Sequence, residues 1–364
     1  MNPVLAPSNP DELAEAVLRH PRVIPVGGTT KPRLTVSSAA PDAVPISTRR
    51  LNGLVEYDPS EFTFTALAGS PVREVARALA ERGQYLPFDP MLSDAGATLG
   101  GTIASGLSGP GRFRFGGIRD FLIGVRFVDG AGRLLRLGGK VVKNAAGFDV
   151  PKFLVGSLGR WGVLAEVTFK VFPKPEAWRT VALHATDLRD AARILHEISV
   201  NRWELDALDV PPTGDRLLVR FGGPGESLAP RAREILERWP GEVLSEPEAD
   251  RAWSDLAEFR WAHPGGRLLK VPLTPDRMSV LREAFHRIGD VRVHFSAGGH
   301  VAYVSTAPDA DPAPIAVALE SSGDIGLALR GAGPLWWGAR PKTEIESAVR
   351  TALDPMNRFV PMEG

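Results

Sequence analysis

Hydrophobic and polar residues follow one another in a pattern that predicts short strands interleaved with amphipathic helices. Alternation is typical of half-buried strands, while apolar residues three and four apart mark one face of a helix. In the first half of the chain the pattern predicts strands at 23–26, 43–47, 62–66 and 163–172, helices at 11–20 and 72–82, and a hairpin of 124–128 with 134–137. Pro71 and Gly83 stand where the second helix is expected to begin and end.

The pattern changes near residue 175. Beyond it the glycine clusters become sparse and strand–helix units follow one another. The expected strands are 180–184, 205–210, 216–221, 268–272 and 325–329, the expected hairpin is 291–305, and the expected helices are 190–198, 228–239, 278–288, 315–321 and 345–353. Two α+β half-units in tandem predict a sheet with helices on one face. We therefore expect a domain boundary near residue 175.

Composition excludes several classes of protein. A chain of 364 residues is long enough for two domains or one elaborated domain. Its 43 basic and 43 acidic residues balance, so nothing indicates electrostatic binding to nucleic acid or to an anionic membrane. The absence of cysteine excludes disulfides, thiol catalysis and an iron–sulfur cluster held by this chain alone. With no signal-peptide pattern and no apolar run of membrane-spanning length, the sequence predicts a cytoplasmic protein.

Glycine-rich clusters are the main chemical signal. They lie at 27–31, 96–106, 143–149 and 156–164. Backbone amides in such segments can point at a diphosphate or pack against a ring system, so we expect the amides at 27–31 and 98–106 to hold a diphosphate. A single cluster is more simply a turn or a bulge, but four of them favour a large cofactor.

Two common nucleotide motifs fit poorly. A Walker loop is excluded because no Gly-Lys-Ser/Thr is present. A nicotinamide fingerprint needs a third glycine and a helix after the first strand, and Pro32 opposes that helix.

A set of motifs in fixed order points to a family. The motifs are GGTTK at 27–31, YDP at 57–59, GSPV at 69–72, GQYLP at 83–87, GGTIASGLSGP at 100–110, RDF at 119–121, KNAAGFD at 143–149 and GSLG at 156–159. Together they make residues 22–172 resemble the FAD-binding domain of the vanillyl-alcohol-oxidase, or PCMH-type, superfamily. The likeness is greatest to the smaller, E-type subunits of bacterial glycolate oxidases. Asp354-Pro355 with Phe359 and Pro361 resembles the closing segment of that family.

The resemblance implies an α+β fold with three parts. A PCMH-type FAD-binding domain of two α+β subdomains is expected at 1–175. A ferredoxin-like α+β cap is expected at 176–335. The C-terminal segment, 336–364, is expected to return to the FAD domain.

The resemblance also implies a set of cofactor contacts. They are Gly27, Gly28, Thr29, Thr30, Lys31, Pro90, Thr98, Gly100, Gly101, Thr102, Ala104, Ser105, Gly106, Arg114, Asn144, Asp149 and Val163. Arg112 and Arg114 are open to two interpretations, as partners of a flavin phosphate or substrate anion and as surface charges. Some superfamily members bond the flavin covalently through His or Cys. This chain has no Cys and no His between His20 and His184, so we predict non-covalent FAD.

An oxidoreductase acting on CH–OH groups is the activity that the resemblance implies. A 2-hydroxy acid such as glycolate would be oxidised to the 2-oxo acid, with hydride transfer to FAD. Electrons would pass to partners, namely a sister catalytic flavoprotein subunit and an iron–sulfur subunit, through which the protein could associate with a membrane. The alternatives are a non-catalytic flavin-binding scaffold and a free-standing FAD-dependent dehydrogenase of another hydroxy acid or of a sugar.

The catalytic residues are not identified by the sequence. His294 and His300 lie on the expected hairpin with no acidic residue between them, so we predict ordinary hairpin residues and no metal site. Arg267, Lys270 and Arg330 are candidate anchors for a substrate carboxylate, although a solvated surface charge explains each of them as well.

Overall fold

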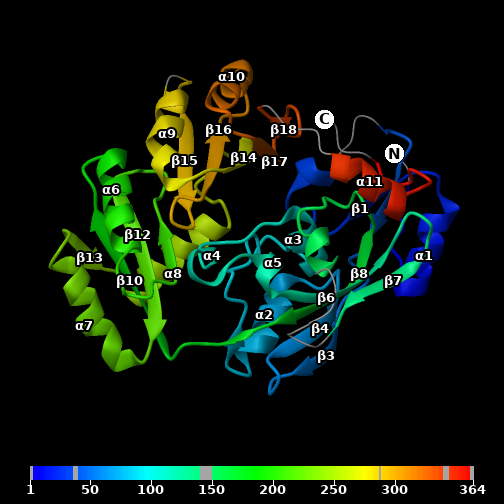
Figure 1. Ribbon diagram of the computed structural model, residues 1–364, viewed down its shortest axis with the longest axis horizontal. Helices are drawn as coiled ribbons and strands as arrows, with labels where there is room; N and C mark the ends of the chain where they lie inside the picture. Colours follow the sequence, from blue (N-terminus) through cyan, green and yellow to red (C-terminus); the bar gives the residue numbers. More distant parts are fainter. Residues whose placement is uncertain (1–2, 36–39, 140–149, 287, 339–343, 361–364) are drawn as a thin grey trace. The chain divides into compact units, whose positions relative to one another are not determined.

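The computed structural model describes residues 3–35, 40–139, 150–286, 288–338 and 344–360 (Figure 1). The chain forms two compact units. Unit 1 comprises Met1–Ser108, Gly117–Lys174 and Pro341–Gly364, and unit 2 comprises Gly109–Gly116 and Pro175–Arg340. The chain passes from unit 1 to unit 2 after Lys174, next to the boundary expected near residue 175. The grouping of Gly109–Gly116 with unit 2 differs from the expected range of 1–175, and the domain ranges stay predictions.

Unit 1 begins with a helix packed beside a parallel pair of strands. Helix α1 (Pro10–Arg19) starts where the Asn9 side chain accepts a hydrogen bond from the Glu12 amide at 2.9 Å. Its apolar face buries Leu13 and Val17. The strands expected at 23–26 and 43–47 are present as β1 (Val23–Val26) and β2 (Val44–Ser47). They pair in parallel, and β1 leads toward the 3₁₀ helix η1 (Pro32–Thr35).

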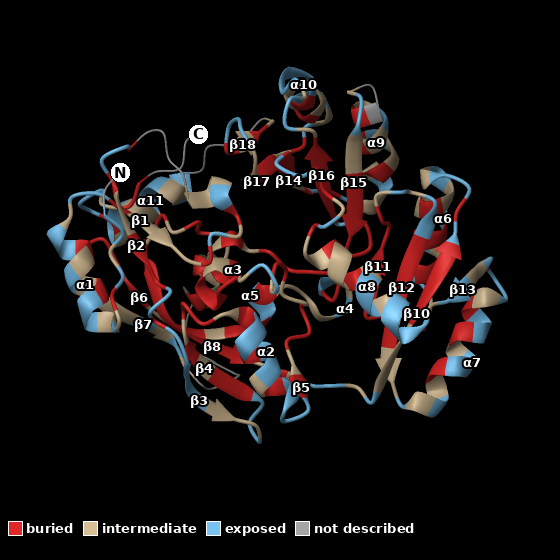
Figure 2. Cartoon of the chain, turned by 180° about the vertical axis from the view of Figure 1, so that it is seen from behind, coloured by how far each residue is buried: buried red, intermediate tan, exposed pale blue. Residues whose placement is uncertain are grey.

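The C-terminal segment flanks β1 on its other side. Helix α11 (Glu344–Leu353) lies near β1 in both ribbon views (Figures 1 and 2). Beyond it, the Val23 amide donates to the Arg358 carbonyl at 2.8 Å, and Phe359 is completely buried beside Val23. The Arg358 guanidinium donates to the His20 carbonyl at 2.6 Å. Strand β1 is therefore held between β2 and residues from the end of the chain.

The main sheet of unit 1 is antiparallel, with the order β3-β4-β8-β6-β7. Its strands are β3 (Leu54–Asp58), β4 (Thr63–Leu67), β6 (Leu122–Val128), β7 (Leu134–Gly138) and β8 (Val163–Lys170). The expected β6–β7 hairpin is confirmed. The central strand β8 is buried from Val163 to Phe169 (Figure 2). Stacking of Phe64 on Phe169, with ring centroids 5.6 Å apart, fixes β4 against β8.

Shorter elements complete unit 1. They are α2 (Val72–Ala80), α3 (Leu99–Ser105), α5 (Ile118–Phe121), η2 (Val150–Leu154) and the small pair β5 (Gln84–Tyr85) with β9 (Phe172–Pro173). Helix α2 is the helix predicted at 72–82. Helix α3 was not predicted, and it packs against β8.

Unit 2 contains two antiparallel sheets. The first has the order β11-β12-β10-β13, with β10 (Ala177–His184), β11 (Ala207–Asp209), β12 (Arg216–Gly223) and β13 (Gly241–Val243). The second has the order β15-β16-β14-β17-β18, with β14 (Arg267–Pro272), β15 (Val291–Ser296), β16 (Val301–Thr306), β17 (Gly326–Arg330) and β18 (Trp336–Trp337). The sheets meet where Val210 and Phe295 exchange backbone hydrogen bonds of 2.8 and 3.0 Å.

Helices cover both sheets of unit 2. They are α4 (Arg112–Phe115), α6 (Leu188–Ser199), α7 (Gly225–Leu236), α8 (Glu246–Ala257), η3 (Pro275–Arg277), α9 (Met278–His286) and α10 (Ala313–Ser322). One apolar core joins residues of α6, α7, α9 and α10 to the same face of both sheets. Helix α8 packs Trp253 and Leu256 on the opposite face, against Ala182 and Leu218. The expectation of helices on one face is therefore wrong for α8, a helix that was not predicted and in which only Trp253 and Leu256 are buried.

Candidate functional site

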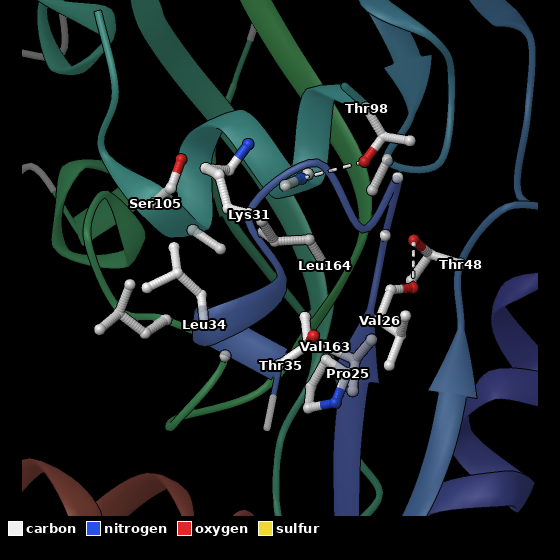
Figure 3. Close-up of a pocket in the computed structure, with 18 of the residues that line it drawn as sticks. Pro25, Val26, Lys31, Leu34, Thr35, Thr48, Thr98, Ser105, Val163 and Leu164 are labelled. Carbon is white, nitrogen blue, oxygen red and sulfur yellow. Dashed lines mark hydrogen bonds between the residues drawn. The ribbon is translucent and has the colours of Figure 1, made fainter. Parts of the chain in front are cut away.

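A pocket in unit 1 opens where three segments of the chain meet (Figure 3). These segments are the loop 27–31 after β1, helix α3, and residues 157–164 that run into β8. The pocket has an empty volume of about 720 Å³, which includes space open to solvent. The lining residues are Pro25, Val26, Gly27, Gly28, Thr29, Thr30, Lys31, Leu34, Thr35, Thr48, Ala68, Thr98, Gly100, Gly101, Ala104, Ser105, Ser157, Leu158, Gly159, Gly162, Val163 and Leu164.

The backbone amides of the loop 27–31 donate to no acceptor in the described part of the chain. Its carbonyl groups, in contrast, are engaged. Arg49 donates to the Gly28 carbonyl at 3.0 Å and to the Gly27 carbonyl at 3.3 Å, while the Thr29 hydroxyl donates to Gly28 at 2.7 Å. Thr29 adopts a left-handed conformation with φ of 56°. The loop thus keeps a run of N–H groups available to an anion, as a backbone nest does.

Helix α3 forms in the glycine-rich stretch because both of its ends are capped. The Thr98 side chain accepts from the Gly101 amide at 3.2 Å, the bond drawn in Figure 3, and Gly106 ends the helix with φ of 60°. The amides of Leu99 and Gly100 donate to Ser70 and Ala68 carbonyls at 3.0 and 2.7 Å.

Most of the amides at 98–106 that were expected to hold a diphosphate are therefore engaged in other hydrogen bonds. Those at 99, 100, 101, 102 and 106 are already bonded within unit 1. The loop at 27–31, in contrast, keeps its amides without a described partner.

Residues 157–164 form the third wall of the pocket and are fastened to α3. The Leu158 amide donates to the Ala104 carbonyl at 2.9 Å. Arg160, 7% exposed, forms an ion pair with Glu346 of α11, with Nη1 and Oε1 2.5 Å apart. The guanidinium also lies over the ring of Trp161. The tail helix thereby supports this wall of the pocket.

Lys31 is the charged side chain that lines this pocket. It is 7% exposed, and its ammonium donates to the Thr30 hydroxyl at 3.0 Å. Burial lowers the pKa of Lys31 to about 8. The remaining lining residues are apolar, glycine, serine or threonine, so the pocket supplies a cation, amides and hydroxyl groups.

The structure brings most of the expected cofactor contacts together. Those that line the pocket are Gly27, Gly28, Thr29, Thr30, Lys31, Thr98, Gly100, Gly101, Ala104, Ser105 and Val163. Pro90, Thr102 and Gly106 are described but do not line it, and Asn144 and Asp149 lie outside the described residues. As FAD contacts, all of these residues stay predictions.

Arg114 belongs to unit 2 and forms two ion pairs there. Its guanidinium lies 2.8 Å from Asp206 and 3.4 Å from Glu204. Asp206 is nearly completely buried, which makes this a structural pair. Arg114 does not line the pocket of unit 1.

Several lining residues were not expected to contact a cofactor. Leu34, Thr35, Thr48 and Ala68 carry no motif that would single them out. The segment 157–164 did carry a signal, because its GSLG motif is one of those that support the family resemblance.

His294 in unit 2 is not an ordinary hairpin residue. Its Nε2 lies 2.7 Å from Asp209 Oδ2, and both side chains are 0% exposed. Its Nδ1 has no hydrogen-bond partner in the structure. No group of three or more potential metal ligands occurs within the described ranges. The pair fastens β15 to β11 at the junction of the two sheets.

The candidate carboxylate anchors of unit 2 differ in their surroundings. Arg267 is buried and donates to the carbonyls of Ala332 and Ala310 at 2.9 and 2.6 Å, which is a structural role. Burial lowers the pKa of Arg330. Lys270 is half-buried, and burial together with the charge of Arg112 lowers its pKa to about 8.

Comparisons with known proteins agree with this architecture. Residues 2–138 match the family model of the FAD binding domain. Glycolate oxidase subunit GlcE of Escherichia coli (strain K12) is 38% identical over 210 residues, which are 57% of this chain and 56% of that protein. Glycolate oxidase subunit GlcD of Bacillus subtilis (strain 168) is 30% identical over 202 residues, 54% of this chain and 42% of that protein.

A solved structure extends the likeness in fold. The crystal structure of p-cresol methylhydroxylase with substrate bound superposes with a TM-score of 0.75 at 14% identity, covering 98% of this chain and 87% of that one. The chain therefore has the PCMH-type fold, and its residues 2–138 resemble the FAD-binding domain family. FAD is its cofactor, and the resemblance to glycolate oxidase subunits is confirmed.

The matched region spans about half the length of the curated relatives. Non-covalent attachment of FAD stays a prediction, based on a pocket lining without His or Cys. Within the described ranges, the helices are too short or too polar to span a lipid bilayer.

Proposed function

We propose that this chain is the FAD-binding subunit of a complex that oxidises a 2-hydroxy acid such as glycolate to the 2-oxo acid. In that complex a sister flavoprotein subunit and an iron–sulfur subunit accept the electrons. The observation that carries the proposal is the pocket at 27–31, α3 and 157–164, found within a chain 38% identical to a glycolate oxidase subunit.

The residues of the pocket fit an FAD diphosphate and its neighbouring groups. The amides of 27–31 and the Lys31 ammonium provide donors and positive charge, and Thr98 and Ser105 add hydroxyl groups to the pocket lining (Figure 3). Bound FAD supplies the hydride acceptor for the oxidation. The protein holds and orients it, and the buried side chains of Val163 and Leu164 make that wall of the pocket apolar.

A catalytic base for the substrate hydroxyl is unassigned. The His294–Asp209 pair in unit 2 is completely buried and bridges two strands, so it has the surroundings of a structural pair. This observation favours a second candidate function, a flavin-binding scaffold in which the sister subunit oxidises the substrate.

Anaerobic mixing separates the two functions. The purified, FAD-loaded chain is mixed with glycolate or D-lactate, and the visible flavin absorbance is followed. Bleaching by the chain alone supports the catalytic subunit and excludes the scaffold. If the flavin of the isolated chain is not bleached, but bleaching occurs when the sister subunit is present, the result supports the scaffold. A chain that takes up no FAD overturns both.

A further inference from the structure

Lys31 occupies a position that costs the empty protein free energy. It is 7% exposed, in a loop fixed by β1 on one side and η1 on the other. Taking an ammonium group out of water disfavours the charged form unless a counter-charge replaces the lost hydration. Thr30, its hydrogen-bond partner, offers only a neutral hydroxyl.

The described lining of the pocket supplies Lys31 with no counter-charge. The other pocket-lining side chains carry no charge. Among flanking residues, Arg33 lies on η1, Arg49 donates to the carbonyls of 27 and 28, and Arg160 follows the third wall. Arg160 is paired with Glu346. Within the described ranges no carboxylate forms an ion pair with Lys31.

Two other shielded cations in the molecule have counter-charges. Arg160 has Glu346 at 2.5 Å, and Arg114 has Asp206 at 2.8 Å. Lys31 differs from both because it faces a pocket where the neighbouring amides of 27–31 are also without a described acceptor. A cation and a run of free N–H groups on one pocket wall are complementary to a phosphate-type anion.

We propose that Lys31 is the charge partner of the FAD diphosphate and that FAD binding is coupled to the protonation of Lys31. This inference rests on the assignment of FAD to this pocket. It adds the condition that Lys31 is protonated when FAD is bound. The coupling makes retention of the cofactor depend on pH, and it makes the pocket select flavins that carry a diphosphate.

The direction of the coupling follows from the two states. In the empty pocket the pKa of Lys31 is about 8, so the amine loses its proton above that pH. A bound diphosphate favours the ammonium form and raises this pKa. FAD binding therefore takes up close to one proton at about pH 9 and almost none at about pH 6.5. The affinity for FAD falls by up to about tenfold per pH unit above pH 8.

Calorimetric titration of the apo-protein with FAD tests the coupling. The full chain is stripped of flavin and titrated at about pH 6.5 and pH 9 in two buffers of different ionisation enthalpy, which gives the number of protons taken up. The variants are Lys31→Met, which removes the charge, and Lys31→Arg, which keeps it without titrating. Lys174→Met is the matched control, an exposed lysine of unit 1 that does not line the pocket.

The expected results distinguish the loss of the Lys31 charge from a loss of folding. Wild-type chain and Lys174→Met take up most of a proton at about pH 9, and neither Lys31 variant does. Lys31→Met binds FAD about 10- to 100-fold more weakly at about pH 6.5, while Lys31→Arg stays closer to wild type. Riboflavin, which lacks the diphosphate, binds wild type and Lys31→Met equally.

Three results would overturn the proposal. They are equal proton uptake by wild type and Lys31→Arg, unchanged FAD affinity in Lys31→Met, or an equal loss of riboflavin and FAD affinity in that variant. Circular dichroism shows whether Lys31→Met folds, and if it does not, the proton uptake of Lys31→Arg decides. Wild-type chain that binds FAD without taking up a proton contradicts the role of Lys31 but leaves the proposed function standing. Wild-type chain that binds no FAD overturns both.

Discussion

Two glycine-rich segments of unit 1, 27–31 and 96–106, look alike in sequence and differ in the structure. The amides of 27–31 have no described acceptor, whereas those of 99–101 are bonded to neighbouring groups. Glycine serves close packing in both segments, since a Cβ on Gly28 would lie 2.1 Å from the Gly96 carbonyl oxygen and one on Gly100 would lie 2.9 Å from the Ala68 carbonyl oxygen. Glycine density therefore marks both a ligand-binding loop and a tightly packed helix, and only the use of the amides tells them apart.

Gly28→Ala tests how strongly the two segments depend on each other. A Cβ there would lie 2.1 Å from the Gly96 carbonyl oxygen, so the loop must move away from the second segment. We expect the free energy of unfolding of the apo-protein to fall by about 2–4 kcal/mol, together with a loss of FAD binding. Urea unfolding and flavin titration measure the two effects.

Gly101→Ala is the matched control for Gly28→Ala. Its Cβ would meet only Thr98 Oγ1, at 3.1 Å, and it lies inside a helix, where alanine is favoured. We expect the unfolding free energy to change by less than about 1 kcal/mol. Equal destabilisation by both substitutions would show that the loss at position 28 does not come from the clash with the Gly96 carbonyl oxygen.

Raising the pH is expected to stabilise the empty pocket while it weakens FAD binding. The folded apo-protein holds Lys31 with a pKa of about 8, below the value of an unfolded lysine. Between these two values the unfolded state binds more protons, so the unfolding free energy rises with pH, by about 1–3 kcal/mol. The measurement is the difference between wild type and Lys31→Met across about pH 7 to 10, which cancels the other titrating groups.

The comparison of wild type with Lys31→Met also predicts which apo-protein is more stable near neutral pH. At about pH 7, Lys31→Met should make the apo-protein more stable than wild type, because a buried charge without a counter-charge is removed. A less stable Lys31→Met apo-protein would show that Lys31 supports the fold rather than the ligand.

Arg160→Met tests whether the tail supports the third wall of the pocket. The substitution removes the ion pair with Glu346, whose side chain is 34% exposed, so water partly compensates the carboxylate. We expect a loss of about 1–2 kcal/mol in unfolding free energy and weaker FAD binding. A double-mutant cycle with Glu346→Gln measures the coupling, and additive effects would show that the pair does not stabilise the wall.

Thr98→Ala is expected to have a smaller effect than Gly28→Ala or Arg160→Met. It removes the hydroxyl that caps α3 and costs about 1 kcal/mol of apo-protein stability. Thr98→Ser keeps the hydroxyl and should retain most of that stability in thermal unfolding. Similar losses in both variants would place the contribution of Thr98 in its methyl group.

The strands and hairpins could be predicted because their signal is local. Alternation and flanking turns sufficed for β1 and β2, and for the β6–β7 hairpin. Helix α3 escaped prediction because adjacent glycines oppose helix formation, and its caps become visible only with the backbone in place.

The site could be predicted in part for the same reason. The loop 27–31 follows directly from a strand and glycines in sequence. The pairing of Arg114 with Asp206 joins residues far apart in the chain, and the burial of His294 depends on Asp209, from another sheet. Such long-range partners are set by tertiary packing, which no local pattern encodes.

The position of Phe359 beside Val23 has a consequence for biosynthesis. Strand β1, which leads into the loop 27–31, receives this neighbour only after the whole of unit 2 has been translated. A nascent chain still on the ribosome lacks it, and so do chains shortened before residue 344. The strand that leads into the loop 27–31 thereby gains its second neighbour only once residue 359 has been translated, and products truncated before that residue would lack it.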